Sequence, residues 1–402
     1  SRSLDELVAA ALLLYPRYVD PLTGAPCEAE RVVEHLTLRR QAFEQNAKRF
    51  FCLDIPLWRR PFVRGYLRSP SAEIHFCADA KAARERGMTS GSTAVVWGIR
   101  GPETLQEELS RDGVGLWRME DGFLRSVRLG SDLAPPGSLV VDSRGIYFDP
   151  RRPSDLEVLL ETAEFSPEEL QRARALRDFI VGAGISKYNP APTSGFRPKA
   201  PEGSTVVLVP GQVVDDASVR LGSPEILDNE GLLRAVRQAR PEAYILYKPH
   251  PDVLSGNRKG HVGGPEPLWD ELVTEASIAD CLAIADEVHT MTSLVGFEAL
   301  LRGKRVATYG SPFYAGWGLT EDRLVTPRRT RRLSVEQLVA GTLLRYPRYV
   351  SWETRSFCTA EDMVAELIRL RATQRNLSYA TPWLFRRARS FIRLAQEWIR
   401  AS

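Results

Sequence analysis

Two adjacent carboxylates, Glu120 and Asp121, stand directly after the strand that the sequence predicts over residues 115–119. Gly122 follows them, and its conformational freedom suits a turn at the end of a strand. A carboxyl group in such a place can act as a general acid or base if its surroundings raise its pKa. An acidic turn with Arg125 as the salt-bridge partner is an equally good interpretation of these residues.

A second acidic pair, Asp215 and Asp216, lies in the loop after the strand predicted over residues 205–209. Gln212 and Ser218 flank it, so one loop carries a carboxylate with hydrogen-bonding neighbours, as a carboxylate nucleophile requires. A pair of metal ligands is the rival chemical role. Taken alone, the motif favours a structural turn with an N-capping aspartate.

A histidine and a helix start are further polar groups at predicted strand ends. Prolines on both sides hold His250 rigidly, and with Lys248 it suits a phosphate or another leaving group, although a lone histidine is more often structural. Thr292 and Ser293 begin a predicted helix, where hydroxyls and backbone amides form an anion site. Glu298, one turn later, can reach a ribose hydroxyl. Capping of the helix by either hydroxyl is the structural interpretation.

The alternation of strands and helices explains why these groups are expected together. Strands are predicted in both halves of the chain, over residues 93–97, 115–119 and 138–141, and over 205–209, 243–247, 287–289 and 305–308. Such a rhythm predicts parallel sheets, whose ligands lie at the carboxyl ends of the strands. Residues 189–203, rich in Pro, Gly and Ser, are the expected linker. We expect an α/β protein with two Rossmann-like domains facing each other across a cleft and additional terminal helices.

A repeat links the two ends of the chain. Stretches within residues 3–19 match stretches within residues 334–350 at a constant offset of 331 residues, and the match extends over more than 30 positions. Solenoid repeats are far shorter, at roughly 20 to 50 residues. The offset is instead the size of a whole two-domain module. We therefore expect residues 1–48 to be the helical tail of a preceding module or a linker, and residues 331–370 to be the closing helices of this one.

Composition argues against several classes of protein. The 402 residues include 54 basic and 51 acidic side chains, and the net charge of +3 is too small for a dedicated nucleic-acid binder. The five cysteines are widely spaced, so we expect neither a zinc site nor disulfides, and a cytoplasmic location follows. No P-loop or GxGxxG motif supports a nucleotide site of those kinds. The longest apolar stretch, residues 7–14, predicts neither a membrane span nor an export signal.

Residues 380–402 predict a basic amphipathic helix. Its apolar side chains recur at helical spacing, with arginines elsewhere around the wheel. They are Leu384, Ala388, Phe391, Leu394, Ala395 and Trp398, with Arg386, Arg387, Arg389 and Arg393. Such a helix suits a peripheral position at the inner face of the cytoplasmic membrane. Packing on the protein's own surface is at least as good an interpretation.

Four motifs together resemble those of the KpsC-type capsule β-Kdo transferases. They are residues 120–126, 211–218, 248–252 and 309–320, and the resemblance covers residues 50–370. The acidic pair and the His-Pro pair also resemble those of bacterial sialyltransferases. The resemblance implies a GT-B fold, CMP-Kdo as the donor, a Kdo-bearing phospholipid or oligosaccharide as the acceptor, and no metal or other cofactor.

The resemblance also implies roles for individual residues. Family members are thought to retain the anomeric configuration through a covalent adduct, which makes Asp216 the nucleophile, with Asp215 as the second choice. Glu120 becomes the general acid/base, with Asp121 as the second choice. His250 would bear the leaving-group charge as part of a donor site. The other residues expected in that site are Gln212, Ser218, Lys248, Thr292, Ser293 and Glu298, and Arg125 and Arg128 are expected to bind the acceptor.

Under the same resemblance, residues 49–190 are the acceptor-binding domain and residues 200–330 the CMP-Kdo-binding domain. A module that follows another is expected to form the β-(2→7) linkage in capsular polysaccharide linker synthesis. Other classes of function stay open. The chain could be a non-catalytic scaffold of a capsule assembly complex, or a GT-B enzyme that uses another nucleotide sugar such as a CMP-sialic acid.

Overall fold

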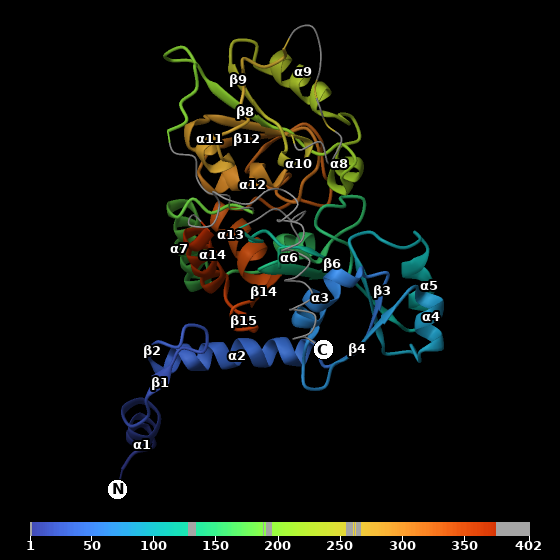
Figure 1. Ribbon diagram of the computed structural model, residues 1–402, viewed down its shortest axis with the longest axis vertical. Coiled ribbons are helices and arrows are strands. Elements are labelled where there is room, and N and C mark those ends of the chain that lie inside the picture. The colour runs from blue at the N-terminus through green and yellow to red at the C-terminus, as the bar shows by residue number, and fades with distance from the viewer. Residues whose placement is uncertain are drawn as a thin grey trace.

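The computed structural model describes residues 2–127, 134–187, 189, 195–254, 260, 262 and 267–374. Two sheets organise the described residues into the two α/β units seen in Figure 1. Arg128 and the helix predicted over residues 380–402 lie outside the described residues. In the part that the structure describes, no helix has the length and apolar character that crossing a membrane requires.

The first sheet has seven strands in the order β15-β14-β7-β6-β5-β3-β4. The neighbours among β3 to β6 pair in parallel, whereas β7, β14 and β15 pair antiparallel. Phe50 and Val95 pack on helix α3, while Phe51 and Val96 point to the other face and pack with α4 and α5. The bounds are β3 Arg49–Leu53, β4 Glu73–Cys77, β5 Thr93–Trp97, β6 Gly115–Asp121, β7 Ser138–Asp142, β14 Pro347–Ser351, β15 Ser356–Cys358, η2 Leu57–Arg59, α3 Arg60–Leu67, α4 Ala80–Glu85 and α5 Leu105–Arg111.

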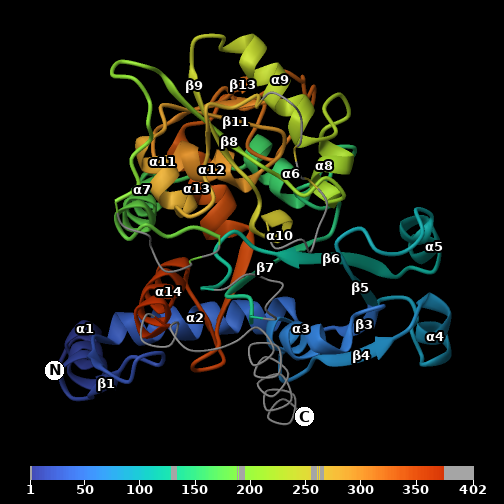
Figure 2. The same ribbon diagram turned by 45° about the horizontal axis from the view of Figure 1, so that its top comes forward.

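The second sheet has six parallel strands in the order β10-β9-β8-β11-β12-β13, with α8 and α9 near one another at its edge in Figure 2. If the strands are numbered along the chain from β8, this order is 3-2-1-4-5-6, the order of the Rossmann fold. In that fold the ligand binds at the carboxyl ends of the first and fourth strands, which are β8 and β11 here. Val207 and Val209 pack with α9, and Val206 and Leu208 pack with α11 and α12. The bounds are β8 Val206–Pro210, β9 Tyr244–Lys248, β10 Glu271–Leu272, β11 Glu287–Thr290, β12 Arg305–Thr308, β13 Glu321–Asp322, α8 Ala217–Gly222, α9 Asn229–Ala239, α10 Pro251–Leu254, α11 Ile278–Ile284 and α12 Leu294–Leu301.

The segment expected to be closing helices, residues 331–370, contains a hairpin as well. Helix α13 (Val335–Val339) continues into the π-helix η4 (Ala340–Arg345), and strands β14 and β15 come before α14 (Ala360–Gln374). β14 pairs with β7, so this segment returns from the second unit to complete the first sheet. The purely helical prediction is therefore wrong for these strands, because Tyr349 and Val350 are buried in a strand whose neighbour β7 lies about two hundred residues earlier in the sequence.

The N-terminal segment repeats this order of elements. It consists of α1 (Leu4–Val8), the π-helix η1 (Ala9–Leu14), the hairpin β1 (Tyr18–Val19) and β2 (Pro26–Cys27), and α2 (Ala29–Gln45). Helix α2 lies against β15, where Arg31 pairs with Asp362 at 2.6 Å. In Figure 1, α1 projects beyond the start of α2, away from both sheets. Helices α6 (Asp155–Thr162) and α7 (Pro167–Gly182) lie between the two units in the chain.

Candidate active site

Gln212 connects the loop after β8 to the turn after β11. Its Oε1 accepts hydrogen bonds from the Thr290 hydroxyl (3.1 Å) and from the backbone N–H groups of Thr292 (2.9 Å) and Ser293 (3.1 Å). Its Nε2 donates to Thr292 Oγ1 at 2.9 Å. The amide oxygen of Gln212 thus accepts three hydrogen bonds from within the protein, and the contact of Gln212 with the donor stays a prediction. Gln212 is a positioning residue for the start of α12, which Ser293 caps.

Asp216 begins helix α8 as its N-cap, so the structural interpretation of this motif is confirmed. Its Oδ2 accepts hydrogen bonds from the Ser218 backbone N–H (3.2 Å) and hydroxyl (2.6 Å), and Thr292 Oγ1 lies 3.4 Å from the same hydroxyl. Asp216 is exposed, as is Asp215. The described residues contain no group of three or more His, Cys, Asp or Glu that could hold a metal ion, so the rival metal role of this pair has no support. The nucleophilic role stays a prediction.

Glu120 lies at the end of β6 with one carboxylate oxygen held in place. Trp97 Nε1 and the Asp121 backbone N–H donate to Oε1 at 3.0 Å and 2.9 Å. Burial, reinforced by the neighbouring charge of Asp121, raises the pKa of Glu120 to about 7. A carboxyl group with that pKa exchanges protons near neutral pH, as a general acid or base must.

Arg125 is buried and bound to Asp121, as the structural interpretation of the acidic turn predicts. Its Nε donates to Asp121 Oδ2 at 2.7 Å and its NH1 donates to Ser126 Oγ at 3.0 Å. The residue is 2% exposed, and in this structure Arg125 positions Asp121. The contact of Arg125 with the acceptor stays a prediction.

Tyr147 shows that carboxylates from the two units come together. Burial raises the pKa of its hydroxyl, Lys187 opposes the rise, and the charges of Glu120, Asp121 and Asp216 add to it. Its hydroxyl also donates to the Asp121 carbonyl at 3.3 Å. Glu120, Asp121 and Asp216 therefore lie near the same tyrosine, although almost a hundred residues separate Asp121 from Asp216 in the sequence.

Glu298 joins α12 to the segment between the units. Its Oε1 accepts a hydrogen bond from the Lys187 backbone N–H at 2.8 Å, and burial raises its pKa. Arg302 donates from NH1 to the Glu298 carbonyl at 2.8 Å and from NH2 to the Ile185 carbonyl at 3.2 Å. One carboxylate oxygen of Glu298 thus binds the segment between the two units. The contact of Glu298 with a ribose hydroxyl stays a prediction.

His250 and Lys248 leave β9 in different directions. The Asp252 backbone N–H donates to His250 Nδ1 at 3.1 Å, which places the proton of the neutral imidazole on Nε2. Lys248 Nζ instead donates to the Ala276 carbonyl at 2.5 Å, and burial lowers its pKa. Lys248 thus has a structural hydrogen bond in this structure, and the roles of Lys248 and His250 in binding a phosphate stay predictions.

Arg59 is a residue of this site that the sequence analysis missed. Its guanidinium carbon lies 3.8 Å from the centroid of the Trp97 ring, the same indole that donates to Glu120. Burial lowers the pKa of Arg59, although the negative charges of Glu120 and Asp121 oppose this shift. Among the described residues, the buried Nε of Arg59 has no hydrogen-bond partner. No motif surrounds Arg59 in the sequence, so only the packing of η2 on β5 reveals it.

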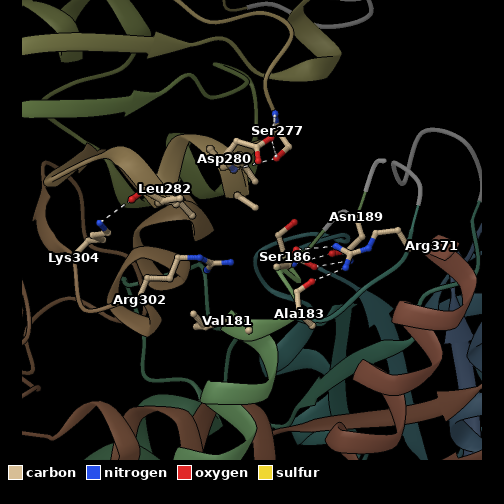
Figure 3. A pocket seen from close by; sticks show the side chains of 15 residues that line it. Val181, Ala183, Ser186, Asn189, Ser277, Asp280, Leu282, Arg302, Lys304 and Arg371 are labelled. Atoms are coloured by element: carbon tan, nitrogen blue, oxygen red, sulfur yellow. Dashed lines mark hydrogen bonds between the residues drawn. The ribbon is translucent and has the colours of Figure 1, made fainter. Parts of the chain in front are cut away.

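A cavity of about 450 Å³ lies behind these residues, and Figure 3 shows its lining. It is bordered by the end of α7, by α11 and by Arg302, Lys304 and Arg371. All three cations donate to backbone carbonyls at its wall. None of the predicted site residues lines it, so we place the candidate active site at the carboxylates around Tyr147 and not in this cavity.

Comparison with known proteins identifies relatives of this chain. A family model described as capsule polysaccharide biosynthesis protein matches residues 93–349. The capsule polysaccharide modification protein LipA of Neisseria meningitidis serogroup B is 44% identical over 378 residues, covering 94% of this chain and 53% of the relative. The lipopolysaccharide-processing protein LpsZ of Rhizobium meliloti is 41% identical, covering 68% of this chain and 63% of the relative. The chain thus spans about half the length of the Neisseria protein.

Two solved structures from Thermosulfurimonas dismutans KpsC are similar over most of the chain. The β-Kdo 2,7 transferase is 35% identical with a TM-score of 0.64, covering 81% of this chain and 100% of the solved one. The β-Kdo 2,4 transferase is 32% identical with a TM-score of 0.69, covering 79% and 97%. Almost all of each solved chain is matched, so the α/β fold with parallel-rich sheets is common to all three.

Proposed function

We propose that this chain, which belongs to the family of capsule polysaccharide biosynthesis proteins and is a KpsC-type capsule protein, is a retaining glycosyltransferase. In this proposal it moves β-Kdo from CMP-β-Kdo to a Kdo-terminated glycolipid, and its two units form a GT-B fold. One observation supports the proposal: helix α8, which Asp216 begins, lies against the segment of Tyr147, since Gly222 is near the Phe148 carbonyl, and the charges of Glu120 and Asp216 both raise the pKa of Tyr147. The two solved Kdo transferases support the choice of sugar.

The first step assigned to the site is attack by Asp216 on the anomeric carbon of the donor. An Asp216 oxygen forms a bond to that carbon while the bond to the CMP phosphate oxygen breaks, and the phosphate keeps the electron pair. The Ser218 hydroxyl orients the attacking carboxylate through its 2.6 Å hydrogen bond. The protonated Nε2 of His250 and the start of α12 are the groups assigned to the charge that develops on the phosphate.

In the second step Glu120 acts as a general base. It takes the proton of the acceptor hydroxyl, whose oxygen bonds to the anomeric carbon as the bond to Asp216 breaks. Two inversions give net retention. A pKa of about 7 leaves a large fraction of Glu120 ionised at neutral pH, so the base is available without a metal-bound hydroxide in the scheme.

Intact-protein mass spectrometry tests the adduct directly. The Glu120→Gln variant, given CMP-Kdo, should accumulate protein heavier by one Kdo residue, because formation of the adduct continues while its discharge to the acceptor is slowed. The Glu120→Gln, Asp216→Asn double variant should show no such species. Normal transfer by Asp216→Ala, or an adduct on a different residue, would overturn the nucleophile assignment.

The choice of nucleotide can be tested separately. A ligand that binds only the folded state raises the melting temperature, and at equal concentration the tighter ligand raises it more. CMP and CDP should therefore raise Tm more than UDP or GDP at equal concentration. A larger rise with UDP or GDP would contradict the CMP-sugar donor, and a chain that binds no nucleotide and transfers no sugar would be the scaffold of the alternative interpretation.

The β-(2→7) linkage stays a prediction within this proposal. Sequence identity ranks the 2,7 transferase first, whereas the TM-score ranks the 2,4 transferase first. Linkage analysis of the product formed on a Kdo-terminated acceptor distinguishes the two. A lipid-linked acceptor would bring the chain to the cytoplasmic face of the membrane, which sedimentation with acceptor-containing vesicles would measure.

A further inference from the structure

The cavity of about 450 Å³ lies where the two units meet. Its wall combines the end of α7 and the turn after it, helix α11, the turn between α12 and β12, and α14. Helix α14 packs on β14 of the first sheet, whereas α11 packs on β8 of the second. The volume falls within the range of roughly 300 to 1,000 Å³ that is usual for small-molecule sites. The cavity can therefore hold a ligand that touches both units.

Three cationic side chains line this cavity: Arg302, Lys304 and Arg371. Figure 3 shows the Arg302 guanidinium extending into the middle of the lining. Each of the three donates to main-chain carbonyls, which carry no formal charge, and among the described residues neither Arg302 nor Lys304 forms an ion pair. Burial lowers the pKa of Arg302, and the charge of Glu298 opposes this shift. The cavity thus holds positive charge that an anion would stabilise.

The carboxylate in the described lining, Asp280, already has partners in the protein. Its Oδ2 accepts hydrogen bonds from the Ser277 backbone N–H at 3.2 Å and from the Ser277 hydroxyl at 2.6 Å. Asp280 and Ser277 form the capping box of α11, so this carboxylate has a structural role.

The remaining wall determines which kind of anion fits. Cations from three separate segments can surround a phosphate, whose oxygens point in several directions, better than a carboxylate, whose two oxygens lie in one plane. Val181, Ile278 and Leu282 provide an apolar part of the lining. A phosphate group attached to a small body, such as a sugar, matches both parts of this wall.

The wall of the cavity is continuous with the candidate active site. The Ile185 carbonyl accepts a hydrogen bond from Arg302, and two residues later the Lys187 backbone N–H donates to Glu298 Oε1 at 2.8 Å. The charge of Lys187 in turn acts on Glu120 and lowers its pKa. A ligand held by Arg302 would therefore restrain the segment that carries Lys187.

We propose that this cavity binds a phosphate monoester of about the size of a sugar phosphate, and that the bound molecule joins the two units and restrains residues 183–187. Its phosphate lies against Arg302, Lys304 and Arg371, and its body lies on the apolar part of the wall. The molecule is an effector and not a substrate, because neither acidic pair of the candidate active site lines the cavity. This inference does not depend on the transferase assignment.

Isothermal titration calorimetry of the 402-residue chain with ribose 5-phosphate tests the binding. We expect saturable binding, and none with ribose at the same concentration and ionic strength. Inorganic phosphate distinguishes the two sources of the anion: weaker binding than that of ribose 5-phosphate supports an ester as the occupant, and equal binding identifies free phosphate. If neither phosphate compound binds saturably, the proposal is overturned.

Substitutions locate the bound molecule. Lys304→Met should weaken ribose 5-phosphate binding at least about 10-fold, which corresponds to the loss of one charge-assisted hydrogen bond. Lys81→Met is the matched control and should bind like the wild type, since Lys81 is exposed on α4 of the first unit. His250→Ala separates this cavity from the proposed donor site. Binding that is lost in His250→Ala but kept in Lys304→Met would place the molecule at the donor site and overturn the proposal.

A blocking variant tests the cavity without removing a charge. Ala279 is half-buried in the wall on α11, so Ala279→Trp should fill the space and prevent binding, and its thermal unfolding shows whether it folds. In the wild type, saturating ribose 5-phosphate should slow hydrogen exchange of residues 183–187 at least about 10-fold. In Ala279→Trp it should have no such effect. Exchange that the ligand leaves unchanged in the wild type, or binding that survives both Ala279→Trp and Lys304→Met, contradicts the proposal.

Discussion

The carboxylates of the two units stand in opposite settings. Glu120 of the first unit is partly buried beside Trp97 and Asp121, and its pKa is raised to about 7. Asp216 of the second unit is exposed at the start of α8, and Ser218 donates two hydrogen bonds to one of its oxygens. The carboxyl group of Glu120 is thus held in a setting that suits proton exchange, whereas that of Asp216 is oriented by hydrogen bonds from Ser218.

This difference gives each carboxylate a separate task in the proposed reaction. A base must gain and lose a proton near the working pH, and a burial-raised pKa meets that need. A nucleophile must stay ionised and point in one direction, and hydrogen bonds to the carboxylate meet that need. The four predictions below test whether the two settings determine the two roles.

The largest effect is expected from Asp216→Asn. Asparagine is as good an N-cap as aspartate, so α8 and the melting temperature should be unchanged, whereas loss of the nucleophile should reduce transfer at least about 10³-fold. Steady-state transfer with CMP-Kdo, together with thermal unfolding, measures both. If activity and stability fell together, the role of Asp216 would be limited to capping helix α8.

Glu120→Gln should reduce transfer by roughly 10² to 10⁴-fold, the range of general base catalysis. In the wild type the active, ionised form of Glu120 is populated above its pKa, so the rate should rise with pH through about 7. The variant should lack that rise. A pH profile with the same inflection in both proteins would place the inflection on another group.

The pH dependence of the free energy of unfolding should also reveal the raised pKa of Glu120. Because the folded-state pKa of Glu120 is raised from 4.5, its stabilising contribution is complete below about pH 4.5 and is lost as the pH rises through about 7. Glu120→Gln should therefore gain on the order of 2 kcal/mol over the wild type at pH 8, allowing for partial exposure, and almost nothing at pH 4. Denaturant unfolding of the wild type and Glu120→Gln at both pH values measures the difference, and an equal difference at pH 4 and pH 8 would contradict the raised pKa of Glu120.

The smallest effect is expected from Arg59→Ala. The positive charge of Arg59 lowers the pKa of Glu120, so its removal should move the midpoint of the pH–rate profile upward by roughly half a pH unit. Arg64→Ala is the matched control, since Arg64 lies on the exposed side of the neighbouring helix α3 over Phe76. A midpoint that stays in place, or that moves equally in the control, removes Arg59 from the site.

The polar residues at the strand ends show how far residue type predicts role. Gln212, Lys248 and Arg125 are all expected to bind substrate, and in this structure each makes a hydrogen bond within the protein. Their partners come from a neighbouring strand, from a later loop and from the adjacent acidic turn. Residue type and strand-end position predict that a side chain reaches the site region. They do not predict whether that side chain already forms hydrogen bonds with other protein groups, because packing determines which groups lie beside it.

The sequence by itself determined the elements and their order. Strand and helix periodicity located β5, β6, β8 and β12, the acidic pairs were placed at strand ends, and the repeat indicated that the two terminal segments correspond to each other. These features depend on neighbours within a few residues. Only the tertiary structure decided which copy of the repeat is buried, where β14 pairs, and that Arg59 lies beside Glu120. Burial and pairing depend on what lies across space, and identical local sequence carries no record of it.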